Sequence, residues 1–287
     1  MKVLVTGVKG QLGYDVVGEL NKRGHESIGV DVEEMDITDK KAVNDVIKQV
    51  MPDAIVHCAA WTAVDLAEDE DKKEKVFAIN GKGTKYIAEV AKEINAKMTY
   101  ISTDYVFDGQ GEKPWMADCK DYAPLNVYGE SKLAGELAVS ETLDKYFIVR
   151  IAWVFGKNGN NFIKTMLKLG KNYDTLRVVC DQIGTPTYTY DLARLLVDMI
   201  ETEKYGYYHA TNEGGYVSWC DFAKEIFSQA GYKTKVNAVT TEEYGLSKAK
   251  RPYNSRLDKS KLIENGFTPL PTWQDALRRY LEEIKEN

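Results

Sequence analysis

A tyrosine and a lysine four positions apart, Tyr128 and Lys132, are the residues of this sequence best suited to proton transfer. The surrounding pattern predicts a helix over 127–143, and residues four apart share one helical face, so both side chains can reach one ligand. A phenol with its usual pKa of about 10 is a poor acid at neutral pH unless a positive charge stabilises its phenolate. Lys132 could supply that charge, which predicts that Tyr128 acts as a general acid.

A second group of residues, near the start of the chain, is suited to binding phosphate. Gly7, Gly10 and Gly13 have G-x-x-G-x-x-G spacing directly after a β-branched run and before a helical pattern. In such a loop the first glycine permits a tight turn, the second lets the backbone approach a pyrophosphate, and the third lets helix and strand pack closely. The helix N-terminus then offers free N–H groups to the phosphates. This context predicts a dinucleotide-binding loop.

An acidic residue at the end of the second predicted strand, Asp31, lies where a carboxylate would hold the hydroxyls of an adenine ribose. Its charge would repel a ribose 2′-phosphate and no arginine follows it directly, so the sequence favours NADH over NADPH. Asp36 and Ile37 are candidates for contacts with the adenine edge.

The elements that must position these residues alternate along the first half of the chain. Apolar and β-branched runs predict strands at 2–6, 27–31, 54–60, 97–102 and 147–153. Helical spacing predicts helices between them, at 12–20, 39–50, 81–94 and 127–143. Repeated strand–helix units predict an α/β fold with a doubly wound parallel sheet of the Rossmann type.

The strict alternation stops after residue 155, which predicts a second, smaller lobe of mixed α/β structure. An Asn/Gly-rich segment, a proline-containing loop at 181–187 and helices near 191–201, 219–230 and 273–284 follow. We expect residues 1–155 to form the NAD(P)-binding domain and 156–287 the substrate-binding lobe, with the chain returning to the first domain near 186–207. The ligand would lie between the lobes, outside the carboxyl ends of the strands.

Composition narrows the class of protein. The 287 residues include 38 basic and 44 acidic side chains, a net charge of −6, which disfavours a nucleic-acid partner. The mean hydropathy of −0.41 disfavours a membrane protein. The first residues lack the pattern of a signal peptide, and the four cysteines lie far apart with no histidine at metal-ligand spacing, so we expect a cytoplasmic protein without a structural metal.

Taken together, these motifs resemble those of the extended short-chain dehydrogenase/reductases. The glycine loop with Tyr128-x-x-x-Lys132 is typical of that family, whose members act largely on nucleotide sugars. Four longer stretches resemble the dTDP-4-dehydrorhamnose reductases in particular: Ala59–Asp65, Ile101–Gly109, Arg150–Gly156 and Arg251–Asp258. The resemblance covers essentially the whole chain and implies an NAD(P)H-dependent enzyme that reduces the C4 keto group of dTDP-4-dehydro-L-rhamnose to dTDP-L-rhamnose, for surface polysaccharide.

The resemblance also implies roles for individual residues. Tyr128 would donate a proton to the keto oxygen, Lys132 would bind the nicotinamide ribose and keep the tyrosine acidic, and Thr103 would hydrogen-bond the carbonyl. The further cofactor contacts that it implies are Gln11, Leu12, Ala59, Ala60, Trp61, Thr62 and Ile101. The substrate contacts that it implies, besides Thr103, are Asp104, Trp153, Asn161 and Arg251, with Arg251 on the diphosphate.

The sequence departs from the resemblance at one point. Some family members dimerise through magnesium bound by glutamates, but Asp15 stands in the first helix here, and Ala193 and Arg194 replace acidic residues in a later one. We therefore expect no metal, and either a monomer or a homodimer. Two other functions stay open: an epimerase or dehydratase of the same superfamily, which would show no net redox, and a regulatory binding subunit without catalysis.

Overall fold

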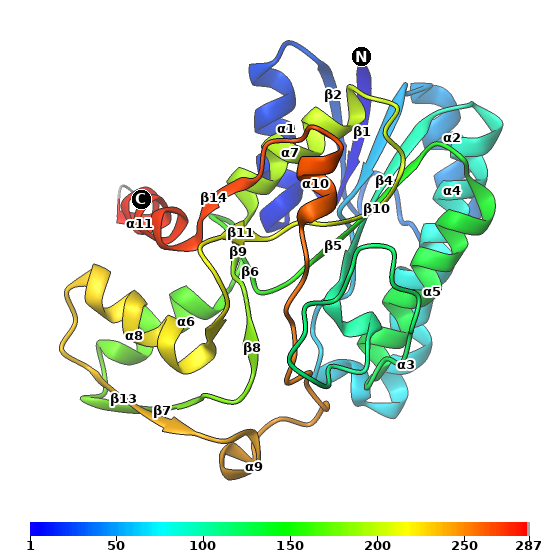
Figure 1. Ribbon diagram of the computed structural model, residues 1–287. Coiled ribbons are helices and arrows are strands. Elements are labelled where there is room, and N and C mark those ends of the chain that lie inside the picture. The colour runs from blue at the N-terminus through cyan, green and yellow to red at the C-terminus, as the bar shows by residue number, and fades with distance from the viewer. Residues whose placement is uncertain (286–287) are drawn as a thin grey trace.

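A six-stranded parallel sheet forms the centre of the first lobe in this computed structural model, which describes residues 1–285 (Figure 1). Its strands lie in the order β10-β5-β4-β3-β1-β2 and every neighbouring pair is parallel. The strands are β1 (Lys2–Thr6), β2 (Glu26–Val30), β3 (Ala54–His57), β4 (Lys97–Thr103), β5 (Tyr146–Ile151) and β10 (Gly206–His209). The chain moves outward from β1 in both directions, so the predicted doubly wound α/β fold is confirmed.

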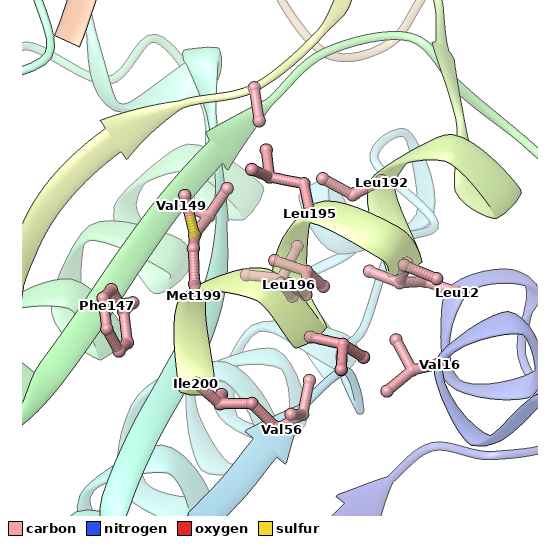
Figure 2. Packing of buried hydrophobic residues seen from close by; sticks show 14 of the residues in the cluster. Leu12, Val16, Val56, Phe147, Val149, Leu192, Leu195, Leu196, Met199 and Ile200 are labelled. Atoms are coloured by element: carbon pink, nitrogen blue, oxygen red, sulfur yellow. The ribbon is translucent and has the colours of Figure 1, made fainter. Parts of the chain in front are cut away.

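Helices cover both faces of the sheet because its strands alternate between two apolar cores. Val3 and Val5 face the core under α1 (Gln11–Lys22) and α7 (Thr189–Ile200), while Leu4 faces the opposite core. Figure 2 shows Leu12 and Val16 of α1 beside the apolar side chains of α7. The opposite core is covered by α2 (Lys40–Val50), α4 (Thr84–Glu93) and α5 (Val127–Thr142).

Side-chain caps set where two of these helices begin. Asp39 accepts hydrogen bonds from the first turn of α2, and Asn126 accepts one from Gly129 N at 2.8 Å at the start of α5. The second Asn126 hydrogen bond, from its amide to Lys250 O at 2.7 Å, ties the start of α5 to the second lobe. Helix α5 therefore begins one residue before Tyr128, at the position that the sequence predicted.

One predicted helix is interrupted in the structure. The pattern at 81–94 predicted one helix, but α3 (Glu70–Phe77) runs into a π-helical turn, η2 (Ala78–Gly83), before α4 begins. Asn80 in this turn accepts a hydrogen bond from Trp61 N and donates to Trp61 O and Ser131 Oγ. This side chain joins the loop after β3 to α5.

The second lobe has its own apolar core, formed by α6 (Phe162–Gly170), α8 (Trp219–Ala230) and α11 (Trp273–Lys285). Two-stranded sheets complete it, including β7 (Thr175–Val179) with β13 (Lys235–Val239). The short elements are η1 (Leu66–Glu68), η3 (Asp104–Val106), β6 (Val154–Phe155), β8 (Ile183–Gly184), β9 (Thr187–Tyr188), β11 (Asn212–Glu213), β12 (Val217–Ser218), α9 (Thr241–Tyr244), α10 (Ser260–Glu264) and β14 (Leu270–Thr272). The sequence did not predict α6 or β13.

Residues 189–209, which lie between two second-lobe segments of the sequence, belong to the central sheet and its helical cover. Helix α7 packs against α1, and β10 pairs in parallel with β5, with Gly206 opposite Phe147. The division of the chain at residue 155 stays a prediction about domain organisation. No helix within residues 1–285 is long and apolar enough to cross a membrane.

Candidate functional site

A cleft of about 850 Å³ lies at the carboxyl ends of the central strands. Most of the predicted site residues line it, although they come from every part of the first lobe. They are Gly7, Gly10, Gln11, Leu12, Gly13, Asp31, Asp36, Ile37, Ala59, Ala60, Thr62, Ile101, Thr103, Asp104, Tyr128, Lys132 and Trp153. Parallel strands bring the residues that follow them to one edge of the sheet, which explains why distant motifs meet here.

The glycine loop at one end of the cleft has the shape that a diphosphate requires. Gly7 has a φ of +69°, and a Cβ built on Gly13 would lie 2.3 Å from Gly7 O, so side chains are excluded at both positions. Gly10 precedes α1 without a side-chain cap, and the first turn carries no acidic residue. The free N–H groups of that turn could therefore hold the phosphates of a dinucleotide.

Charged side chains flank the end of the cleft that is lined by Asp31 and Asp36. Asp31 accepts hydrogen bonds from Lys9 N at 3.0 Å and Val32 N at 2.9 Å, which fix its carboxylate beside the glycine loop. Thr38 donates from its hydroxyl and its backbone N–H to Asp36, and these bonds lower the pKa of that carboxyl. Lys9 also lines the cleft, a cation beside Asp31 that the sequence analysis missed.

Tyr128 lies on the first turn of α5, edge-on to the ring of Tyr105 with centroids 5.5 Å apart. Burial raises the pKa of Tyr128 above its usual value, the interaction with the Thr103 hydroxyl lowers it, and the nearby Asp104 and Tyr105 raise it further. A neutral phenol is therefore the stable form, as an acid requires before it donates its proton.

Lys132 is buried one turn further along α5. Its ammonium donates to Ile101 O at 2.6 Å and lies 4.2 Å from the centre of the Tyr100 ring. Burial lowers the pKa of Lys132 to about 7, partly offset by the negative charge of Glu136. The ammonium is held at the Ile101 carbonyl and Thr103 is the group that lowers the pKa of Tyr128, so the expectation that Lys132 keeps the tyrosine acidic stays a prediction.

Thr103 and Asp104 lie where β4 ends and η3 begins. The Thr103 hydroxyl donates to Asp104 Oδ1 at 3.1 Å and accepts from Tyr105 N at 3.2 Å. Asp104 is 2% exposed, and burial raises the pKa of its carboxyl to about 6 although Ser255 and Thr103 act to lower it. A buried hydroxyl and a weakly acidic carboxyl therefore stand beside the phenol.

Two stacked indoles form the wall of the cleft on the side of the second lobe. Trp153, after β5, has a φ of +52°, and its ring stacks on Trp219 of α8 with centroids 3.7 Å apart. A left-handed backbone is unusual for so large a residue and such strain is concentrated at functional sites. Trp219, which also lines the cleft, was not predicted, because it lies far from Trp153 in the sequence.

Three predicted contacts lie outside the cleft lining. Asn161 caps α6, and its amide donates to Gln11 Oε1, Gly156 O and Tyr280 OH. Trp61 packs with Val127 and donates from its ring to Ala63 O. Arg251 pairs with Asp65 at 2.6 Å and donates to Tyr105 OH at 3.2 Å. Hydrogen bonds and packing within the protein engage these side chains, and their expected sugar and cofactor contacts stay predictions.

A buried ion pair joins α5 to the central sheet. Arg150 of β5 donates twice to Glu136 of α5, both at 2.8 Å, and both side chains are fully buried. The guanidinium also donates to Ala117 O at 3.1 Å and lies against the rings of Phe107 and Tyr207. This arrangement fixes α5 to the sheet one turn after Lys132.

The chain is similar to known proteins along nearly its whole length. Residues 1–286 match the family model described as the RmlD substrate binding domain. The spore coat polysaccharide biosynthesis protein SpsK of Bacillus subtilis is 42% identical over 98% of this chain and 97% of that protein. The dTDP-4-dehydrorhamnose reductase of Aggregatibacter actinomycetemcomitans is 42% identical over 96% of this chain and 97% of the enzyme.

A solved structure agrees with these sequence matches. The dTDP-4-dehydrorhamnose reductase of Bacillus anthracis, in complex with NADP, superposes with a TM-score of 0.93 at 43% identity and covers 98% of this chain and 99% of that one. Fold, family model and curated relatives thus agree, and the chain belongs to the RmlD substrate binding domain family, among whose members are dTDP-4-dehydrorhamnose reductases.

Proposed function

We propose that this protein reduces the C4 keto group of dTDP-4-dehydro-L-rhamnose with NADH or NADPH, yielding dTDP-L-rhamnose for surface polysaccharide. The observation that carries the proposal is the shared cleft, in which the glycine loop, the buried Thr103 and Lys132 side chains and the half-buried Tyr128 line one space. The names of the relatives support the choice of substrate. The cofactor supplies the hydride, and the protein supplies the proton and the positioning.

The site residues divide this work. Tyr128 donates its proton to the keto oxygen as the oxygen gains negative charge, and the phenol that burial keeps neutral is the form that can do so. Thr103, held by Asp104 and the backbone of Tyr105, offers a preorganised hydroxyl to the same oxygen. Lys132 orients the cofactor ribose from the floor of the cleft. Trp153 and Trp219 bound the space for the sugar.

The remaining ligand contacts belong to the same proposal. Gly7, Gly10 and Gly13 would leave room for the cofactor diphosphate. Asp31 would hold the hydroxyls of the adenine ribose. Arg251 would bind the substrate diphosphate only by leaving Asp65, its partner in the structure. We infer a cytoplasmic enzyme that works as a monomer or homodimer without a nucleic-acid partner, in keeping with its net charge of −6.

The test measures oxidation of NADH and of NADPH with enzymatically generated dTDP-4-dehydrorhamnose, for the wild type and Tyr128→Phe. Loss of the phenolic proton should lower kcat/KM by about 10²–10⁴-fold. Cofactor affinity should not change, which controls for misfolding.

Other outcomes select the other functions. Interconversion of sugar nucleotides without net oxidation of the reduced cofactor would identify an epimerase or dehydratase. Binding of a protein partner in stoichiometric amounts, with no reductase activity in the wild type, would identify a regulatory subunit.

A further inference from the structure

His57, at the end of β3, is a buried histidine that the proposed chemistry does not use. Its Nδ1 lies 2.7 Å from the hydroxyl of Thr6 at the end of β1, and its Nε2 lies 3.1 Å from the hydroxyl of Thr84 at the start of α4. Each of the three side chains is at most 1% exposed. Because buried polar groups are hydrogen-bonded, the partners of the ring show which of its nitrogens carries the proton.

The other hydrogen bonds of the two hydroxyls fix the direction of each contact. Thr84 donates its hydroxyl proton to Asn80 O at 2.8 Å, so its oxygen has to accept from His57 Nε2. Burial lowers the pKa of His57 to about 3, so the ring is neutral and its Nδ1 is an acceptor. The Thr6 hydroxyl therefore donates to Nδ1, and its oxygen accepts from Ala59 N at 3.1 Å.

The segment that follows β3, Ala59–Trp61, is held at both ends by these groups. The Thr6 hydroxyl accepts from its first N–H at 3.1 Å, and the Asn80 amide binds the N–H and the carbonyl of its last residue at 2.8 and 3.1 Å. The first two residues of the segment line the cleft, and a Cβ on Gly7 would meet its backbone at 2.8 Å. A shift of this segment would therefore move a wall of the cleft beside the glycine loop.

The same hydrogen bonds continue to the backbone of Tyr128. The Asn80 amide donates to Ser131 Oγ at 2.9 Å, and the Ser131 hydroxyl donates to Tyr128 O at 2.7 Å. Both linking side chains are buried, as are the three around His57. Buried hydrogen bonds thus join the wall beside the glycine loop to the residue that is proposed to give the proton.

We propose that His57, as the neutral Nε2–H tautomer, is a positioning residue that orders these hydrogen bonds and so fixes the Ala59–Trp61 segment relative to Tyr128. The other neutral tautomer would set the lone pair of Nε2 against the Thr84 oxygen, whose proton is already used. Positioning matters because hydride and proton have to reach one carbonyl group, and a displacement of about 1 Å can cost about 10²-fold in rate. The inference rests on the proposed reductase function.

The tautomer is measured directly by NMR of protein that carries ¹⁵N-labelled histidine. We expect a protonated, pyrrole-like Nε2 and an unprotonated, pyridine-like Nδ1 for His57 at neutral pH. The chain has three histidines, so the signals that are absent from His57→Asn identify those of His57. A ring protonated on Nδ1, or on both nitrogens, would refute the inference without reference to activity.

The role in the reaction is measured with Thr84→Val, which removes the hydroxyl that accepts from His57 and lies outside the cleft lining. With dTDP-4-dehydrorhamnose, kcat should fall by at least about tenfold, while the Kd for NADPH changes by less than about threefold, because the ligand contacts themselves remain. With NADPH deuterated at the transferred position, the isotope effect on kcat should rise, since misaligned hydride transfer then limits the rate. His57→Asn, whose shorter amide cannot reach both hydroxyls, should show the same split between kcat and Kd.

Two variants control for the loss of a buried hydroxyl. Thr84→Ser keeps the hydroxyl and should hold kcat within about threefold of the wild type. Thr99→Val, on β4, removes a hydroxyl that is just as buried but has no hydrogen-bond partner among residues 1–285, so it should behave like the wild type.

The outcomes are distinct. If Thr84→Val loses no more activity than Thr99→Val, the hydrogen bonds of His57 do not position the reacting groups and the inference is wrong. If the affinity for NADPH falls as much as kcat, or the isotope effect stays unchanged, the role is merely structural and the inference is equally wrong. A wild type that reduces no dTDP-4-keto sugar would instead overturn the proposed function, and with it the role of His57 in reduction.

Discussion

At the scale of single residues, the depth at which Lys132 is buried decides its charge. Burial brings the pKa of this lysine to about 7, whereas exposed lysines stay charged well above that pH. Its positive charge is therefore present below about pH 7 and is lost as the pH rises through that value. Lys132 differs in this respect from the exposed lysines of the chain.

This burial predicts how cofactor affinity depends on pH. The affinity of the wild type for NADPH should fall as the pH rises through about 7, because the ammonium that attracts the anionic cofactor is lost. Calorimetric titrations one pH unit below and above that value measure the change. Lys132→Met should show a weaker pH dependence, while Lys92→Met, an exposed site on α4, should follow the wild type. If the affinity for NADPH depended on pH equally in the wild type and in Lys132→Met, Lys132 would not be the group responsible.

A second residue, Asp31, is predicted to set the choice between the two reduced cofactors. Its carboxylate, fixed beside the glycine loop by Lys9 N and Val32 N, would repel a 2′-phosphate. Asp31→Ser should raise the ratio of kcat/KM for NADPH to that for NADH, by about tenfold if the repulsion is worth about 1.4 kcal/mol. Glu26→Gln removes a charge from the other end of β2 and should leave the ratio unchanged. A ratio that stays constant in both variants would exclude this role.

At the scale of elements, the contact between the glycine loop and α1 controls the shape of the cofactor site. The backbone at Gly13 lies so close to Gly7 and Val8 that an added Cβ would meet them at 2.3 to 2.9 Å. These neighbours are backbone atoms, which cannot turn aside as a side chain does. The first turn of α1 would have to move away from the loop.

This contact predicts opposite effects for two substitutions in one helix. Gly13→Ala should destabilise the protein by about 1–3 kcal/mol and weaken binding of NADPH, since the first turn would shift. Gly18→Ala, where an added Cβ meets nothing within 4 Å, should be neutral or stabilise the helix by about 0.5–1 kcal/mol. Urea unfolding and cofactor titration measure both. If Gly13→Ala bound NADPH as tightly as the wild type, this contact would not control the shape of the cofactor site.

At the scale of the whole molecule, the Arg150–Glu136 pair joins the sheet, the catalytic helix and the connection that follows η3. Both charges are fully buried, and the guanidinium also donates to Ala117 O and Cys119 O. Removing one partner would leave the other charge in the core without a counter-ion. The pair therefore couples the stability of the fold to the position of α5.

This coupling predicts a large loss of stability from one substitution. Arg150→Met should lower the free energy of unfolding by about 3–5 kcal/mol, because Glu136 would be left buried and unpaired. Adding Glu136→Leu to that variant should recover much of the loss, and the exposed Arg177→Met should change stability by about 0.5 kcal/mol or less. Urea unfolding tests all three. If Arg150→Met alone were as stable as the wild type, the coupling would be disproved.

The sequence by itself determined the features that depend on local patterns. Alternating apolar runs predicted the parallel sheet, because the periods of strand and helix differ. The spacing of Gly7, Gly10 and Gly13 predicted a loop whose geometry only glycine allows, and the helical pattern over 127–143 predicted where α5 begins.

Only the tertiary structure decided how these parts meet. The stacking of Trp153 on Trp219 and the burial of Lys132 between Ile101 O and the Tyr100 ring arise where separate elements pack together. Asn161, a predicted sugar contact, also caps α6 and donates to Gln11 and Tyr280. Local propensity cannot reveal such roles, because burial and partner choice depend on residues far away in the sequence.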